Sequence, residues 1–172
     1  EAAAFLRRNG ADVTRVRKLF SDSMEDYKAR AEAVRQAEVY KKCFAISVCP
    51  AEGVESPTVV GAQAANELLD IVGMKASVVL TPYEGKIYIS ARSIDEVNVQ
   101  VMMEKLGGGG HLTMAGAQTK GIDLEEGRAR LLQAIDEYYD TLENKDEPKA
   151  LTQSEPGPVQ MVPEEVKEEK KA

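Results

Sequence analysis

The feature that most constrains this chain of 172 residues is a run of four glycines, Gly107 to Gly110, followed directly by His111, its only histidine. Glycine has no Cβ atom, so such a run lets successive backbone amides turn toward a bound anion. We expect a helix to begin at about His111 and to add its free N–H groups and the positive end of its dipole. The stretch therefore predicts an anion-binding loop; the alternative is a flexible or tight loop without a ligand.

Length and composition indicate one globular domain with extensions rather than two complete domains. Apolar residues make up 43% of the chain, and with no Trp and three Phe the core must be mainly aliphatic. The net charge of −7 argues against a protein that binds long duplex DNA by neutralising its phosphates. Any nucleic-acid role is therefore expected to be local, in a basic pocket for a short nucleotide.

The two cysteines, Cys43 and Cys49, lie six residues apart in a predicted strand. We expect them on the same face of that strand, too far apart to bond, and acting as small apolar residues in a reducing compartment. The chain shows neither a secretory signal nor a membrane-spanning apolar run, so a cytoplasmic location is expected. It begins with Glu1 rather than Met, so we expect it to be part of a longer protein.

The first 40 residues are predicted to be mainly helical. The basic segment from Phe5 to Phe20 indicates a turn at Asn9-Gly10 followed by a short helix. Ser23 and Asp26 resemble a capping box that begins a second helix, which we expect to continue to about Tyr40. Its narrow apolar stripe is typical of a connector helix that docks by one face.

The central part alternates between predicted strands and helices. A buried strand is expected over Cys43–Val48, and a helix is expected to begin at about Thr58 and end at Gly73. The core-facing positions of that helix are expected to be Val60, Ala64, Leu68, Leu69 and Val72. Two further strands, Ala76–Thr81 and Lys86–Arg92, are predicted to form a hairpin.

The second strand of that hairpin has a polar face. Tyr88, Ser90 and Arg92 alternate with apolar residues, so they lie in one row. An aromatic ring, a hydroxyl and a guanidinium in a row are suited to contact a base and a phosphate. The alternative is an ordinary solvent-facing row with an ion-paired arginine.

The rest of the chain predicts a helix that leads into the glycines, a short strand and a long final helix. The helix covers about Val97–Leu106 and the strand about Ala117–Ile122. Asp123 begins the amphipathic final helix, and from about Asn144 the composition predicts a disordered tail. The predicted fold is therefore α/β, with a mixed β-sheet flanked by helices, an N-terminal connector helix and a disordered C-terminal tail. The predicted units are residues 1–40, 41–143 and 144–172.

Two stretches resemble a known family. Ile89-Ser90-Ala91-Arg92-Ser93, together with Val97 through the glycines to His111, resembles the substrate-binding C-terminal domain of the DHH phosphoesterase superfamily. The segment from Phe5 to Asp12 resembles the end of the catalytic domain in GdpP-type bacterial cyclic-di-AMP phosphodiesterases. The resemblance covers about Ala4 to Leu142, so residues 1–40 would contain the end of the catalytic domain and the connector, and 41–143 the substrate-binding domain.

The resemblance implies a division of labour within a phosphodiesterase that hydrolyses cyclic-di-AMP to a linear dinucleotide. A missing N-terminal domain would bind two Mn²⁺ ions, and this domain would hold the dinucleotide. The intact parent would be membrane-anchored through an upstream segment. The implied substrate-binding residues are Ser90, Arg92, Asn98, Gly108, Gly109, Gly110 and His111.

The same resemblance implies that the chain alone is inactive, because it has one histidine and no Asp-His-His motif for a metal centre. No residue is assigned as catalytic; His111 is either a hydrogen-bond donor or an accessory acid. Expected partners are cyclic-di-AMP or linear di-adenylate, the missing catalytic domain and a second copy in a homodimer.

Two other functions stay open from the sequence. Similar domains are appended to RecJ-like exonucleases and alanyl-tRNA synthetases, so a nucleic-acid-binding module is an alternative, although the acidic charge counts against it. A purely structural or dimerising module is another, and in that case Arg92 and His111 would be dispensable for binding any ligand.

Overall fold

The computed structural model describes residues 1–19, 21–94 and 96–146. After three helices at the start, pairs of strands alternate with single helices. In chain order they are α1 (Ala2–Arg8), α2 (Val13–Leu19), α3 (Met24–Arg35), β1 (Glu38–Tyr40), β2 (Phe44–Val48), α4 (Pro57–Leu69), β3 (Ala76–Tyr83), β4 (Lys86–Ser93), α5 (Val99–Lys105), β5 (Gly109–Gly110), β6 (Met114–Lys120) and α6 (Leu124–Asp146).

The strands form one six-stranded sheet in the order β1-β2-β3-β4-β6-β5. β2 and β3 are parallel, and every other neighbouring pair is antiparallel. The predicted mixed sheet is therefore confirmed. The parallel pair needs a crossover connection, which α4 provides between β2 and β3.

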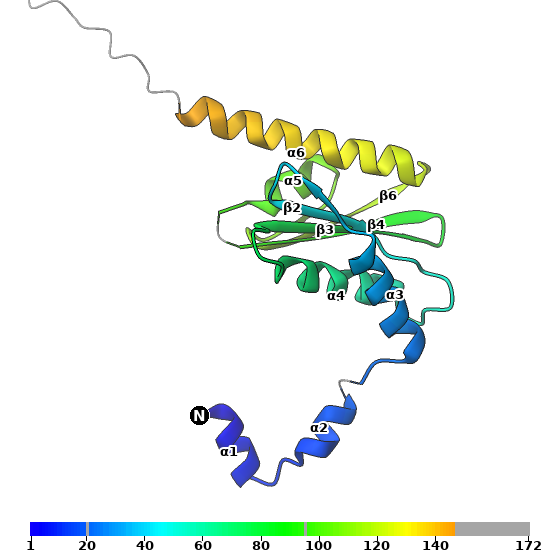
Figure 1. Cartoon of the computed structure of the whole chain (residues 1–172), viewed down its shortest axis with the longest axis vertical. Helices are drawn as coiled ribbons and strands as arrows, with labels where there is room; N and C mark the ends of the chain where they lie inside the picture. Colours follow the sequence, from blue (N-terminus) through cyan, green and yellow to red (C-terminus); the bar gives the residue numbers. More distant parts are fainter. Residues whose placement is uncertain (20, 95, 147–172) are drawn as a thin grey trace, which may run out of the picture.

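Helices cover both faces of the sheet, with α3 and α4 on one side and α5 and α6 on the other (Figure 1). Each layer has its own hydrophobic cluster, so β3 is buried on both faces, which explains its nearly continuous apolar sequence. The larger cluster faces α5 and α6 and includes Phe44, Val78, Leu80, Ile89, Met102, Met103, Leu131 and Ile135. The smaller one faces α3 and α4 and includes Ala33, Ala45, Val60, Ala64, Leu68 and Val79.

The predicted hairpin of β3 and β4 is confirmed. Its turn is formed by Glu84 and Gly85, both with positive φ (50° and 70°), which suits the right-handed twist of two antiparallel strands. β4 buries every second residue, as its alternating sequence predicts. Its other residues face the side of the sheet that α4 covers in part, where Arg92 reaches Asn66.

The connector helix is shorter than predicted. The Ser23 hydroxyl accepts a hydrogen bond from the Asp26 amide at 3.0 Å, which confirms the predicted start. The helix then ends at Arg35, and the expectation that it continues to Tyr40 is wrong. Positive φ angles at Lys41 and Lys42 turn the chain back, so Glu38–Tyr40 instead pairs with β2 as strand β1.

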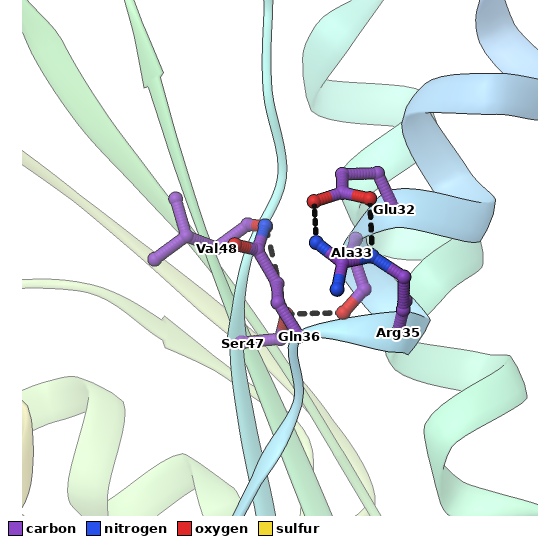
Figure 2. Close-up of polar contacts among 6 residues, drawn as sticks. All are labelled: Glu32, Ala33, Arg35, Gln36, Ser47 and Val48. Atoms are coloured by element: carbon purple, nitrogen blue, oxygen red, sulfur yellow. Dashed lines mark hydrogen bonds and ion pairs between the residues drawn. The ribbon is translucent and has the colours of Figure 1, made fainter.

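Hydrogen bonds fasten the end of α3 to β2 (Figure 2). The Ser47 hydroxyl donates to the carbonyl of Ala33, which lies in the last turn of the helix, and Gln36 Nε2 donates to the carbonyl of Val48 at 2.6 Å. Carbonyls in the last turn have no partner within their own helix, so the strand supplies one. The contact fixes α3 against the sheet.

The two cysteines lie on opposite sides of the sheet, so the prediction of a shared face is wrong. β2 begins only at Phe44, and Cys43 belongs to the preceding turn, outside the strand alternation. Cys43 packs with the α5–α6 layer and contacts the Tyr139 hydroxyl at 2.8 Å, whereas Cys49 is buried in the α3–α4 layer. Both thiols are free.

Three further boundaries differ from the sequence prediction. α4 ends at Leu69 with Asp70 as its C-cap, so Val72 is not a core residue and 97% of it is exposed. Helices flank Asn9-Gly10 on both sides, rather than only after it. α6 continues to Asp146, so the first residues of the predicted tail are helical; the remainder of that tail, 147–172, lies outside the described residues.

Candidate functional site

An open cleft of about 410 Å³ lies beside the N-terminal end of α4, over strands β4 and β6. Its residues come from α4, β4, β6 and the segment between α5 and β5, which are far apart in the sequence. They are Thr58, Tyr88, Ile89, Ser90, Gly107, Gly108, Gly116, Ala117 and Gln118. The structure thus brings part of the glycine run and part of the polar row of β4 into one site.

The first glycine of the run, Gly107, ends helix α5. Gly107 adopts a φ of +76°, its amide donates to Glu104, and the amide of Gly108 donates to Met103. This is the Schellman arrangement, which closes the last turn of a helix with a left-handed residue. The amides of Gly107 and Gly108 are therefore used within the protein and do not form the predicted anion cradle.

Close packing on β6 explains two of the other glycines. A Cβ atom on Gly108 would lie 2.6 Å from Cβ of Ala117, and one on Gly110 would lie 2.8 Å from Cβ of Ala115. Both distances are well inside van der Waals contact, so a side chain at either position needs β5 to move away from β6. Gly109 differs, because a Cβ atom there would meet nothing within 4 Å.

His111 does not begin a helix, so that prediction and the helix dipole it invoked are wrong. The residue closes a tight hairpin between β5 and β6, in which its amide donates to the Met114 carbonyl at 2.7 Å. The physical reason is that Gly109 and Gly110 pair with β6, which holds the segment extended. The His111 side chain is exposed at the tip of this hairpin and does not line the cleft.

The polar row of β4 is arranged as predicted, and the register adds a second row from β6. Tyr88 lies opposite Gln118, Ser90 opposite Gly116, and Arg92 opposite Met114. Directly opposed residues of antiparallel strands point to the same face, so each pair forms one step along the sheet. Because Gly116 has no side chain, the cleft is open above Ser90.

Arg92 lies one step beyond Ser90, outside the residues that line the cleft. Its Nε donates to Asn66 Oδ1 at 2.9 Å, and its guanidinium also donates to the carbonyl of Ala91 at 2.9 Å. Within the described part of the chain it has no carboxylate partner, unlike the ion-paired arginine of the alternative interpretation. Burial lowers the pKa of Arg92, although a guanidinium remains charged. A half-buried cation without an ion pair is suited to bind an anion.

Asn98 has a structural position that its sequence did not predict. Its side chain accepts hydrogen bonds from the amides of Gln100 and Val101, so it caps the N-terminus of α5. Asn98 does not line the cleft. It fixes the helix that leads into the glycine run.

Sequence reasoning missed the contribution of α4. Thr58 lines the cleft from the first turn of this 13-residue helix, and no side chain of the described residues caps that end. The Ser56-Pro57 pair signals a helix start. No local signal shows that this end faces Ser90, because the two are brought together only by the crossover between β2 and β3.

The described residues do not fit the implied metal ions. Among residues 1–19, 21–94 and 96–146, no three His, Cys, Asp or Glu side chains are grouped as metal ligands would be. Burial raises the pKa of Cys49 to about 11, so this thiol is protonated at neutral pH.

None of the described helices combines the length and apolar character that crossing a bilayer requires.

Comparison with known proteins gives a consistent result. Residues 42–141 match the family model described as the DHHA1 domain. The chain is 41% identical over 140 residues to the cyclic-di-AMP phosphodiesterase PdeA of Listeria monocytogenes, covering 81% of this chain and 21% of that protein. It is 42% identical over 142 residues to the cyclic-di-AMP phosphodiesterase GdpP of Bacillus subtilis, covering 81% of this chain and 22% of that protein.

The fold also resembles a solved structure. The crystal structure of an exopolyphosphatase-related protein from Bacteroides fragilis superposes with a TM-score of 0.67 at 22% sequence identity, over 82% of this chain and 43% of that one. At this identity the likeness concerns the fold alone. The chain spans about a fifth of the length of the two phosphodiesterases it matches.

Proposed function

Because the chain belongs to the DHHA1 domain family, we propose that it is the dinucleotide-binding part of a phosphodiesterase that converts cyclic-di-AMP to a linear dinucleotide. The proposal is supported by the names of two relatives about 41% identical to the chain. The observation that carries it is the position of Arg92, a half-buried cation without an ion pair in the described part of the chain, one step from Ser90 and the cleft.

In this proposal the phosphate lies between Arg92 and the glycine run. The Arg92 guanidinium neutralises its charge, and the Ser90 hydroxyl, which has no protein partner among the described residues, donates a hydrogen bond. Gly109 leaves open space where a side chain would lie, so a phosphate can approach its backbone, while Gly108 and Gly110 act indirectly by holding this segment against β6. Asn98 acts indirectly by holding α5, and His111 contacts the ligand from the tip of its hairpin.

The chain alone is proposed not to hydrolyse the ligand. Its described residues do not assemble the several carboxylates and histidines that a two-metal site requires. Incubation of the purified chain with Mn²⁺ and cyclic-di-AMP, followed by chromatography of the nucleotides, is expected to show no linear product. Turnover that depends on Mn²⁺ and on this chain would contradict the proposal.

One observation favours the alternative of a nucleic-acid-binding module. Lys86 and Lys120 lie directly opposite each other, one step beyond Tyr88, and neither forms an ion pair with any residue the structure describes. Opposed like charges destabilise a strand pair unless an anion lies between them. A longer strand of nucleic acid could place a further phosphate there.

Calorimetric titration with cyclic-di-AMP, linear di-adenylate and hexa-adenylate distinguishes these functions. We expect the wild type to bind the dinucleotides, with no gain in affinity for the hexamer. Arg92→Ala should weaken binding by about tenfold or more, because it removes a charge-assisted hydrogen bond. Arg130→Ala is the matched control, since Arg130 lies on α6, across the sheet, and pairs with Glu126. Affinity that rises with length and falls steeply with salt would favour the nucleic-acid module.

A further inference from the structure

We propose that Tyr88 and Gln118 form a base-recognition pair that selects adenine, an inference that rests on the proposed dinucleotide-binding function. The two residues lie directly opposite each other on β4 and β6, and both line the cleft. Their step of the sheet is adjacent to the Ser90–Gly116 step, on the side away from Arg92. The cleft therefore has an aromatic and amide end and a cationic end.

The spacing of these steps suits a nucleotide. Residues on one face of a strand are separated by about 6.8 Å for every two positions. A phosphate held between Arg92 and Ser90 would place the attached sugar over Ser90 and Gly116, where no side chain obstructs the β6 side. The base would then lie over Tyr88 and Gln118.

Tyr88 offers an aromatic ring that contacts Tyr83 and Lys86. Its centroid lies 6.5 Å from that of Tyr83, with the rings tilted by 45°, and the Lys86 ammonium lies 5.7 Å from its centre. An aromatic side chain beside a nucleotide site favours stacking on a base, whichever base it is. Tyr88 should therefore contribute affinity for both purines.

Gln118 would distinguish adenine from guanine. Its side-chain amide is exposed and has no hydrogen-bond partner among the residues the structure describes, so both its donor and its acceptor are available. Adenine presents an amino donor beside the N7 acceptor, which a glutamine amide matches with two hydrogen bonds. Guanine presents two acceptors at the corresponding edge, so the donor and the acceptor of the Gln118 amide cannot both be matched there.

The test compares cyclic-di-AMP with cyclic-di-GMP, two ligands with the same sugar-phosphate ring and different bases. We expect the wild type to prefer cyclic-di-AMP and Gln118→Ala to reduce that preference by about tenfold, as expected for the loss of a two-bond contact. Gln133→Ala, on the opposite face of the molecule, should leave the preference unchanged. Tyr88→Leu should weaken both ligands, and Tyr88→Phe should retain most of the affinity that Tyr88→Leu loses.

The outcomes separate this inference from the proposed function. If the wild type binds neither ligand, or if Arg92→Ala has no effect on either, the proposed function itself is overturned. If Arg92→Ala weakens both ligands but Gln118→Ala leaves their ratio unchanged, the dinucleotide function stands and the base-recognition pair is overturned. Thermal melting of each variant verifies that a lost affinity does not come from unfolding.

Discussion

The four consecutive glycines do not all serve the same purpose. Gly107 ends α5 with a left-handed backbone, and Gly108 and Gly110 allow β5 to lie close against β6. Gly109 meets neither demand, because its added Cβ would be in open space. Packing and backbone conformation therefore explain three of the glycines, and the fourth is free to serve the approach of a ligand.

Alanine substitutions at Gly108 and Gly109 should separate these reasons. Gly108→Ala is expected to lower the free energy of unfolding by about 2 kcal/mol or more, because the new methyl group overlaps Ala117 and the backbone of Gly116. Gly109→Ala should change it by less than about 0.5 kcal/mol and should weaken dinucleotide binding. Urea denaturation measures the first quantity and calorimetric titration the second.

Equal stability of Gly108→Ala and Gly109→Ala would contradict these separate roles of the two glycines. So would dinucleotide binding by Gly109→Ala that is as tight as in the wild type. Gly85→Ala provides a reference for backbone strain without crowding. Its φ is +70°, and nothing lies within 4 Å of an added Cβ. We expect it to cost about 1 kcal/mol.

Secondary-structure elements are fastened to one another by buried serine hydroxyls. Ser47 on β2 donates to Ala33 on α3, and Ser77 on β3 donates to Ala65 on α4 at 2.5 Å. Both serines are almost fully buried. The helices are thus held to the sheet by hydrogen bonds as well as by the small α3–α4 cluster.

Removing the first of these hydroxyls tests the attachment of α3. Ser47→Ala should lower the free energy of unfolding by roughly 1–2 kcal/mol, because it leaves the buried Ala33 carbonyl without a partner. Ser21→Ala is the matched control, since the Ser21 hydroxyl also donates to a helix-end carbonyl, that of Lys18, but in an exposed position. Denaturation curves that showed equal losses for the two variants would exclude a special role for the buried contact.

At the scale of the whole molecule, the two N-terminal helices stand apart from the folded core. Neither α1 nor α2 buries a residue, and both project away from the sheet (Figure 1). Phe5, Leu6 and Leu19 are largely exposed. By contrast, α3 contributes Ala29 and Ala33 to the smaller cluster, so the cooperative unit begins at α3.

Truncation should reveal that boundary. Deleting residues 1–19 is expected to change the melting temperature by less than about 2 °C, because no buried contact is lost. Deleting residues 1–35 should lower it by several degrees or more, since Ala29 and Ala33 of α3 pack in the smaller cluster with residues of α4. Calorimetry of both truncations provides the comparison, and a large loss from the shorter deletion would show that α1 and α2 stabilise the domain.

The sequence by itself determined most elements of this protein, because their signals are local. The alternation of β4 predicted the row of Tyr88, Ser90 and Arg92, and the cap at Ser23 predicted the start of α3. Local patterns failed where a distant strand decided the outcome. Glu38–Tyr40 became β1 because β2 was available to pair with it, and Gly109-Gly110 became β5 instead of leading into a helix because β6 lies beside it.

Only the tertiary structure decided how the candidate site is assembled. The register of β4 on β6 sets Gln118 opposite Tyr88 and Gly116 opposite Ser90, and the crossover helix brings Thr58 to the same cleft. Neither the β4–β6 register nor the position of Thr58 can be predicted from local sequence. Both depend on the packing of residues that lie far apart in the chain.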